Sequence, residues 1–496
     1  MNLAFPRFNS STPRSPMKDI IPLILLLAAS TLLAAEPHRV AISLREPTQT
    51  ALAESLTTYM ADAKQRFPVK LQVYYKDFDL QFVDHNKDGV DDAYKGTPQL
   101  KDWVANIRAS EKAGENDISG LRTFFAKTHD DSTGKAPVTT PSIKQRGIVS
   151  EGDWNRLAAV MAKARRGEEI CVAAIGGSIT AGGLQTKDPK NRYIARVADW
   201  FTQTFPAAKV RFVNAGIGGT NSLYGAMRVQ RDVLSKKPDL VIVEYAVNDN
   251  HPVPMFWGSY EGVLRQILRE SQQPAVVQLF FMQRKGENAQ ETQQMLGRHY
   301  ELPMVSFRDA WWPEIYTSRA KWEVMYADVV HPNDTGHILA SELLIALLGD
   351  VNAKHGPSAT ANRAELPAPM ISDLFANCRY AQGSDLKPTQ NSGWTQTPDG
   401  TKWESPASTD GGIEFGFSGK LLFVGYDIDK EAEPFASFTI DGGLAQPLKS
   451  SANRLPLAED LPPGQHRVRI EFAGSKVPAG STAKVKIWAV GAAGVH

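Results

Sequence analysis

Short apolar runs alternate with helical stretches from residue 154 to residue 348, and this alternation constrains the fold more than any other feature of the chain. Five runs are apolar on both faces and are predicted as strands, at 170–175, 210–214, 240–245, 275–281 and 304–307. Around them, residues 154–165, 193–205, 260–271 and 335–348 repeat apolar side chains at helical spacing. Strands buried on both faces that alternate with helices are typical of a parallel sheet. The sequence therefore predicts an α/β domain with helices on both faces of the sheet.

The residues after about 375 follow a different pattern. Runs of alternating apolar and polar residues, such as 413–417, 421–426 and 468–472, are separated by turns rich in Gly, Pro and Asp-Gly. This pattern predicts an antiparallel β-sandwich of jelly-roll type. The chain has 496 residues, which is more than one domain with a single hydrophobic core usually contains, so several domains are expected. We predict a signal peptide at 1–35, a small α+β region at 36–147, the α/β domain at 148–352, a linker at 353–374 and the β-sandwich at 375–496.

The composition excludes some functions. Charged residues make up 22% of the chain and the formal net charge is +1, so nothing indicates a surface for nucleic acid. The two cysteines, Cys171 and Cys378, are too few for a disulfide framework or a zinc cluster. Cys171 lies in the first predicted strand, and we expect two buried thiols.

The N-terminus has the pattern of a targeting segment. Arg14 and Lys18 precede an apolar run at 20–33, and the small residues Ala34 and Ala35 follow it. The run is short for a bilayer span, and its flanks are those of a secretory signal peptide cut near Ala35. We therefore expect a secreted or periplasmic protein without a membrane partner once the signal is removed.

One loop in the N-terminal region matches the front of a calcium-binding loop. Oxygen-bearing residues fill its first, third, fifth and ninth positions: Asp84, Asn86, Asp88 and Asp92. Lys95 stands at the twelfth position, where such loops carry glutamate. A structural calcium ion and a polar turn held by Asx hydrogen bonds are two open interpretations. The flanking residues predict a helix at 48–66 and a strand at 69–75.

Residues suited to chemistry follow several of the predicted strands. Ser178 follows the first strand after two glycines, Gly219 follows the second strand and Asn248 the third. Asp328 and His331 lie in the last loop before the closing helix. Taken singly, each is more often a turn, cap or loop residue. Because parallel strands end at one edge of a sheet, where ligands collect, we expect all of them to meet there.

Each of these residues suits one role in acyl transfer. A serine becomes a nucleophile when a base takes its proton, and His331 suits that role for Ser178. Asp328 can orient the imidazole. The backbone N–H groups of Ser178 and Gly219 and the side-chain amide of Asn248 can stabilise an oxyanion. Because the base must be neutral to act, activity should fall in acid.

These blocks resemble those of the SGNH hydrolases, an esterase and lipase superfamily named for its Ser, Gly, Asn and His. Here those residues are Ser178, Gly219, Asn248 and His331, and Asp328 completes a D-x-x-H block. The resemblance covers about residues 170–348. It implies a flavodoxin-like three-layer α/β/α domain and an acyl-enzyme mechanism that needs no metal or other cofactor.

The first and third blocks depart from the usual pattern. Gly177 replaces the aspartate of Gly-Asp-Ser, and Ala246 replaces the glycine of Gly-x-Asn-Asp. Neither position takes a direct part in the chemistry of the superfamily. The departures therefore bear on which subfamily the chain resembles and not on the expected reaction.

A secreted hydrolase with an appended β-sandwich resembles the carbohydrate esterases that remove acetyl groups from polysaccharides. The resemblance implies an acetylated carbohydrate as substrate. Trp257, Trp311 and Trp312 could stack on sugar rings near the site, and Trp394 and Trp403 could do so on the sandwich; core packing is the alternative for each.

Other activities on the same fold are a lipid esterase, a thioesterase and an acetyltransferase. A lipase is less favoured because the sequence has no long apolar lid. A non-catalytic glycan-binding protein is a further alternative, but it would not need Ser178, Asp328 and His331.

Overall fold

The computed structural model describes residues 39–44, 69–75, 78–84, 137–183, 185–249, 254–316, 320–355, 365–450 and 455–495. The chain divides into two compact units, Met1–Thr133 with Trp312–Ala320, and Gly134–Trp311 with Lys321–His496.

The first unit contains a three-stranded sheet in the order β1-β2-β3, formed by β1 (Arg39–Leu44), β2 (Val69–Tyr75) and β3 (Phe78–Asp84). β1 pairs with β2 in parallel, and β2 pairs with β3 in the antiparallel sense. β2 confirms the strand predicted at 69–75. Asp84, the first of the predicted calcium ligands, ends β3. The predicted helix at 48–66 and the other three calcium ligands lie outside the described residues.

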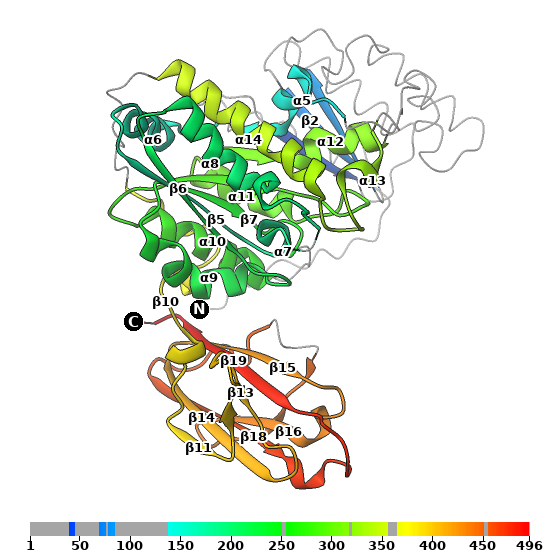
Figure 1. Ribbon diagram of the computed structural model, residues 1–496, viewed down its shortest axis with the longest axis vertical. Helices are drawn as coiled ribbons and strands as arrows, with labels where there is room; N and C mark the ends of the chain where they lie inside the picture. The colour runs from blue at the N-terminus through cyan, green and yellow to red at the C-terminus, as the bar shows by residue number, and fades with distance from the viewer. Residues whose placement is uncertain are drawn as a thin grey trace, which may run out of the picture. The chain divides into compact units, whose positions relative to one another are not determined.

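The second unit is built on a six-stranded sheet in the order β4-β9-β8-β7-β5-β6 (Figure 1). Its strands are β4 (Ile148–Ser150), β5 (Glu169–Gly176), β6 (Lys209–Gly216), β7 (Leu240–Glu244), β8 (Ala275–Phe280) and β9 (Met304–Ser306). β5 to β9 are the five predicted strands; they run parallel, while β4 is antiparallel to β9. The parallel strands follow the order 2-1-3-4-5, which is flavodoxin-like. The predicted fold class is confirmed.

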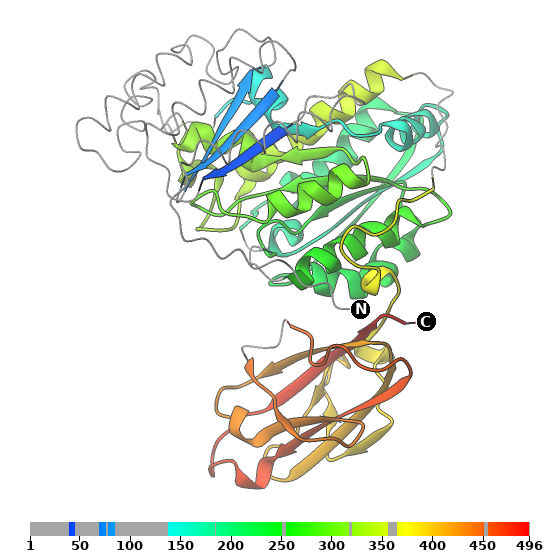
Figure 2. The ribbon, with the colours of Figure 1, turned by 180° about the vertical axis from the view of Figure 1, so that it is seen from behind.

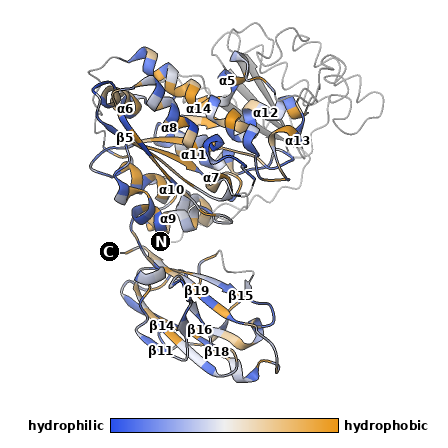
Figure 3. Cartoon of the chain, viewed as in Figure 1, coloured by the Kyte–Doolittle hydropathy of each residue, from blue (hydrophilic) through white to orange (hydrophobic). Residues whose placement is uncertain are grey.

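Helices cover both faces of this sheet (Figures 1 and 2). α6 (Asn155–Arg165), α8 (Tyr193–Thr204) and α14 (Asp334–Lys354) lie on one face, where α14 contacts the other two. α9 (Ser222–Asp232), α10 (Pro254–Leu268) and α11 (Gln290–His299) lie on the other. The central strands carry the apolar residues that both layers bury (Figure 3). Residues 260–271 were predicted as helix, but α10 begins earlier and ends at Leu268.

α14 is longer than predicted. Asn333 caps its start, because Oδ1 accepts the N–H of Gly336 at 3.2 Å. It continues to Lys354 since no proline interrupts it. Its length and composition would suffice to cross a membrane, but 56% of its apolar stretch is buried in the protein. It is a core helix of the α/β domain.

The α/β domain includes a helix that precedes residue 148, the predicted start. Helix α5 (Pro141–Gly147) begins after Thr140, whose hydroxyl accepts the N–H of Ile143 at 3.3 Å. The Arg146 side chain is fully buried and donates to the backbone oxygens of Asp309 and Ala310 at 2.8 and 2.5 Å. These contacts tie α5 to the domain.

The C-terminal residues form two packed antiparallel sheets. One sheet has the order β10-β19-β13-β12, with β15 on the other side of β19, and the second has the order β11-β14-β18-β16-β17. The strands are β10 (Cys378–Gln382), β11 (Gln390–Ser392), β12 (Thr395–Gln396), β13 (Trp403–Glu404), β14 (Asp410–Ser418), β15 (Leu421–Ile428), β16 (Ala436–Ile440), β17 (Gln446–Pro447), β18 (Gln465–Ala473) and β19 (Val485–Ala493). Alternate residues of β18 face a shared apolar core. The predicted β-sandwich is confirmed.

The end of the predicted linker lies against the α/β domain. Glu261 of α10 is buried, and its carboxylate accepts the backbone N–H groups of Met370, Ile371 and Ser372 at 2.5, 2.8 and 2.9 Å. The hydroxyl of Tyr300 donates to the same carboxylate at 2.5 Å. Residues of β15 and β19 then join the apolar core of the α/β domain. The two domains of this unit therefore share packed surface.

The two cysteines are free thiols. Cys171 in β5 is buried as predicted, whereas Cys378 in β10 is half-buried.

Candidate active site

Ser178 is the first residue of the one-turn helix α7 (Ser178–Ala181), which leaves the carboxyl end of β5. The turn lies against backbone that has no room for side chains. A Cβ on Gly176 would lie 2.1 Å from the hydroxyl oxygen of Thr180, and one on Gly216 would lie 2.1 Å from the nitrogen of Ala181. The two glycines at the ends of β5 and β6 thus let the turn approach the sheet edge.

Ser178, His331 and Asp328 lie in hydrogen-bonding sequence. Oγ of Ser178 lies 2.9 Å from Nε2 of His331. Nδ1 of His331 lies 2.8 Å from Oδ2 of Asp328. Because a carboxylate can only accept, Nδ1 carries the proton and Nε2 is free to accept from the serine. This is the arrangement of a nucleophile, its base and the group that orients the base.

Asp328 is held by its own loop. Its Oδ1 accepts the backbone N–H groups of Val330 and His331 at 2.8 and 2.7 Å. Its backbone oxygen accepts the indole N–H of Trp322 at 2.8 Å. Burial raises the pKa of Asp328, but the backbone and imidazole hydrogen bonds of His331 outweigh it and hold that pKa below its usual value. These bonds therefore favour the ionised form of Asp328 beside the His331 imidazole.

Two of the three candidate oxyanion donors, Gly219 and Asn248, come from the loops after β6 and β7. Gly219 has a φ of 69°, which a side chain rarely permits. Its neighbour Gly218 adjoins the nucleophile: a Cβ there would lie 3.9 Å from Cβ of Ser178. The amide of Asn248 lies against Gly177, the residue before Ser178. The structure thus brings Gly218, Gly177 and Asn248 together around Ser178, with Gly219 next in the chain.

Two buried carboxyl groups support these loops, and neither was given a role from the sequence. Glu244 ends β7 and accepts the Thr180 hydroxyl at 2.9 Å; burial raises its pKa to about 7, against the bonds from Thr180. Asp249 accepts the N–H of Ser222 at 2.9 Å and Nε2 of Gln293 at 3.0 Å, and burial raises its pKa to about 7. Asp249 therefore ties the Asn248 turn to the start of α9. The one sequence feature that could have indicated a role for Asp249 is its position directly after Asn248 in the third block.

Arg228 is a further residue that the sequence did not indicate. It lies on α9 and its side chain is fully buried. Its guanidinium donates to the backbone oxygen of Ala215 at 2.6 Å and to that of Gly176 at 3.0 Å, and it pairs with Asp232 at 3.1 Å. It joins the ends of β5 and β6, from which the loops of Ser178 and Gly219 leave. An arginine within a helix gives no sequence signal for such a role.

Most of the tryptophans proposed from sequence to stack on sugar rings are buried. Trp311 and Trp312 are only 1% and 7% exposed. Trp394 is 3% exposed in the core of the sandwich, and Trp403 is half-buried with its N–H bound to the backbone oxygen of Leu386 at 3.1 Å. Core packing, the alternative given for each tryptophan, accounts for Trp311, Trp312 and Trp394. Trp257 is half-buried on α10.

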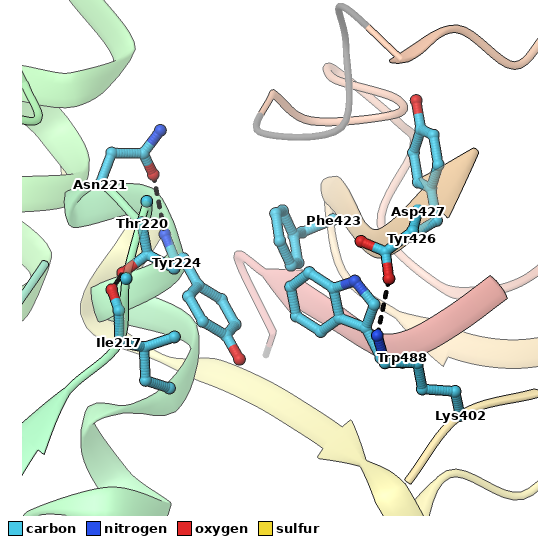
Figure 4. Close-up of a pocket in the computed structure, with 11 residues that line it drawn as sticks. Ile217, Thr220, Asn221, Tyr224, Lys402, Phe423, Tyr426, Asp427 and Trp488 are labelled. Carbon is cyan, nitrogen blue, oxygen red and sulfur yellow. Dashed lines mark hydrogen bonds and ion pairs between the residues drawn. The ribbon is translucent and has the colours of Figure 1, made fainter. Parts of the chain in front are cut away.

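Other aromatic residues line a cavity beside the Gly219 loop. The cavity has a volume of about 370 Å³, and Figure 4 shows Tyr224 of α9 facing Phe423 of β15 and Trp488 of β19. The ring centroid of Tyr224 lies 5.5 Å from that of Phe423 and 5.2 Å from that of Trp488. Ile217, Gly218, Gly219, Thr220 and Asn221 form the wall toward the active site. An ion pair of 2.7 Å between Lys402 and Asp427 lies on the sandwich side.

Trp488 is placed by the glycine opposite it. A Cβ on Gly425 of β15 would lie 2.4 Å from the indole ring. The cavity joins segments far apart in the chain, which is why the alternating pattern of β19 did not reveal it.

Within the described ranges, no group of three or more His, Cys, Asp and Glu side chains could hold a metal ion.

The chain is similar to known hydrolases. Residues 174–339 match the GDSL-like Lipase/Acylhydrolase family. A two-domain esterase (CEX) active on acetylated mannans is similar at 28% identity and a TM-score of 0.64, over 71% of this chain and 99% of its own. The same esterase co-crystallised with mannopentaose matches at 28% identity and a TM-score of 0.63, over 71% of this chain and 98% of its own. No curated protein sequence matches the chain. The α/β domain of this chain belongs to the SGNH, or GDSL-like, hydrolases, and the chain is a carboxylic ester hydrolase.

Proposed function

We propose that the chain is a secreted serine esterase that removes acetyl groups from a polysaccharide or oligosaccharide. The observation that carries the proposal is the 2.9 Å separation between Oγ of Ser178 and Nε2 of His331. A hydroxyl held at this distance from an oriented imidazole can be deprotonated as it attacks an ester carbonyl.

In the first half of the reaction, His331 takes the proton of Ser178 as the serine oxygen bonds to the acetyl carbon. The carbonyl oxygen becomes an oxyanion, which the N–H groups of Ser178 and Gly219 and the amide of Asn248 stabilise. Each such donor lowers the barrier by about 3–4 kcal/mol. The bond to the sugar oxygen then breaks, and that oxygen leaves with the proton from His331.

In the second half, His331 takes a proton from water, and the hydroxide formed attacks the acetyl-serine. The tetrahedral intermediate collapses, Ser178 regains the proton, and acetate leaves. Asp328 stays ionised and stabilises the imidazolium of each half-reaction. No step requires a metal ion, and the predicted calcium ligands take no part.

A carbohydrate substrate is supported by the cavity next to the Gly219 loop. Trp488 is half-buried, whereas Tyr224 and Phe423 are only 4% and 1% exposed, so the Trp488 ring suits the apolar face of a sugar. The polar wall of the cavity suits the sugar hydroxyl groups. An acetylated chain that occupied it would extend toward Ser178, since Gly218 adjoins both the cavity and the serine. The similar acetylmannan esterase is also a two-domain protein, and the likeness covers 71% of this chain.

Export is supported by the N-terminal apolar segment at 20–33 with its positive flank and small residues near position 35. A polymeric substrate outside the cell is consistent with that route.

The test compares wild type, Ser178→Ala and the surface variant Ser235→Ala on p-nitrophenyl acetate and on acetylated xylan, xyloglucan, mannan and pectin. We expect wild type and Ser235→Ala to release acetate, and Ser178→Ala to lose at least about 10³-fold in kcat. A p-nitrophenyl ester series from acetyl to decanoyl is measured alongside, and activity that rises with chain length would instead assign a lipid esterase. Undiminished turnover by Ser178→Ala would refute the proposed mechanism.

A further inference from the structure

Thr180 anchors the turn that carries Ser178. It lies two residues after the nucleophile and is fully buried. Its hydroxyl donates to Oε2 of Glu244 at 2.9 Å and lies 2.8 Å from the hydroxyl of Tyr193. Its backbone oxygen accepts the side-chain amide of Asn214 at 2.8 Å. One residue thus connects the nucleophile turn to β7, α8 and β6.

The hydrogen bonds around Thr180 have a defined direction. The Thr180 hydroxyl donates its single hydrogen to Oε2 of Glu244 in the ionised form of that carboxyl group, which can only accept. The hydroxyl of Tyr193 then donates to the oxygen of Thr180. The three side chains form a buried chain from Tyr193 through Thr180 to Glu244. In a buried site such a chain fixes side-chain positions more strongly than exposed contacts do.

The same cluster contacts the helix that follows the base. The ring of Tyr193 stacks on His337 of α14, with centroids 5.9 Å apart and planes 12° apart. The backbone N–H of Tyr193 points to Nδ1 of His337 at 3.5 Å. His337 is buried, which lowers its pKa to about 4 and keeps it neutral. α14 begins at Asp334, three residues after His331. Tyr193 therefore contacts both the turn that carries Ser178 and helix α14, which follows the loop that carries His331.

We propose that Thr180 is a positioning residue that, through Glu244 and Tyr193, sets Ser178 against His331. The inference deepens the proposed function and rests on it. Thr180 does not touch the reacting atoms; its hydroxyl controls where the first turn of α7 lies. A displacement of the serine by about 1 Å can lower the rate by about 10²-fold.

The test uses Thr180→Val, which keeps the shape but removes the hydroxyl, and Thr180→Ser, which keeps the hydroxyl. The matched control is Ser306→Ala. Ser306 is also a fully buried hydroxyl at the carboxyl end of a strand of this sheet, but it bonds to Gln290 at 2.7 Å and not to the nucleophile turn. Steady-state kinetics on p-nitrophenyl acetate, the second-order rate of Ser178 labelling by a fluorophosphonate, and thermal unfolding are measured for each.

We expect Thr180→Val to lower kcat and the labelling rate together, by about 10–100-fold, with KM within about twofold of wild type. Thr180→Ser should recover most of both rates. Ser306→Ala should retain kcat even where it lowers the unfolding temperature. Equal rates for Thr180→Val and Ser306→Ala would overturn the inference.

Glu244→Leu, which removes the acceptor of the Thr180 hydroxyl at similar side-chain size, provides a second route if Thr180→Val does not fold. Because the two residues act through one hydrogen bond, Glu244→Leu should lower the labelling rate in the wild-type background and in the Thr180→Ser background, where the hydroxyl is kept. A labelling rate unchanged by Glu244→Leu would refute the inference. Loss of turnover in Ser178→Ala, with no effect of the Thr180 and Glu244 variants, would reject the positioning role and leave the proposed function in place.

Discussion

The amide oxygen of Asn248 lies so close to Gly177 that a Cβ on Gly177 would be 2.2 Å from it. The Asn248 amide therefore leaves no room for a side chain at Gly177. This explains why the first block of the chain reads Gly-Gly-Ser. The aspartate usual at this position would push the Asn248 amide away from the nucleophile.

Gly177→Asp, which restores the usual block, should therefore abolish activity. We expect kcat to fall by on the order of 10²–10³ because an oxyanion donor is displaced. The unfolding temperature should change little, since the amide is the end of a side chain and can move. The control is Gly349→Ala, where a Cβ would meet nothing within 4 Å. Near-normal kcat in Gly177→Asp would show that Asn248 does not act from its present position.

Trp488→Ala should weaken binding of polymeric substrate. The indole forms one wall of the aromatic cavity, so its loss removes a face on which a sugar ring can stack. We expect KM for the acetylated polysaccharide to rise by about 3–10-fold relative to any change in KM for p-nitrophenyl acetate. Trp403→Ala is the control, because this half-buried tryptophan belongs to the same sheet but lies outside the cavity. Equal effects of the two variants on KM would count against a sugar-binding cavity.

The α/β domain could be predicted from sequence because its signals are local. Strands such as β7 are apolar at every position but the last, and the glycines and polar residues after them mark one edge of the sheet. The position of Ser178 follows from topology, because this residue comes shortly after β5 and parallel strands end at one edge. His331 comes 25 residues after the end of β9, past α12 (Phe307–Tyr316) and α13 (Trp322–Met325), so topology alone does not place it. The cavity could not be predicted, because Tyr224, Phe423 and Trp488 come from three distant elements of two domains. The tryptophans chosen from sequence were misleading because apolarity alone does not distinguish core packing from an open ring face.

Glu261→Gln should loosen the connection between the α/β domain and the sandwich. The carboxylate accepts three consecutive backbone N–H groups. In the glutamine side chain an NH₂ group replaces one of the two oxygens, so at least one of these N–H groups would face another donor. We expect a loss of roughly 1–3 kcal/mol from the folded state. Chemical unfolding and limited proteolysis near residue 370 measure the effect. Glu287→Gln, at an exposed glutamate of the same domain, should match wild type. Unchanged proteolysis of Glu261→Gln would refute this role.

His466 should make the sandwich more stable in mildly acidic solution than in alkaline solution. Its Nδ1 lies 2.6 Å from Asp441 and its Nε2 lies 2.7 Å from the backbone oxygen of Pro462, so both nitrogens face acceptors. The hydrogen bonds to Asp441 and Pro462 raise the pKa of His466 above 6.5, against the opposing effect of burial. The stabilisation is complete below the unfolded-state pKa and disappears as the pH rises through the higher folded-state pKa.

Burial raises the pKa of Asp441, but the hydrogen bonds from the His466 side chain and the backbone N–H of Arg467 outweigh it and hold that pKa below 3.8. The contribution of Asp441 to folding stability is therefore lost only as the pH falls through this lower folded-state pKa. The pair therefore stabilises most between about pH 4 and pH 6.5. His466→Gln should reduce the fall in unfolding temperature between about pH 6 and pH 9. An identical pH dependence in variant and wild type would contradict this account.

The most direct test of the catalytic account is the site of covalent labelling by a fluorophosphonate, mapped by mass spectrometry of proteolytic peptides. We predict a single adduct on Ser178 whose formation abolishes acetate release, and a labelling rate that falls by at least about 10²-fold in His331→Ala. An adduct on another residue that abolishes turnover, or rapid labelling of Ser178 without His331, would contradict the account.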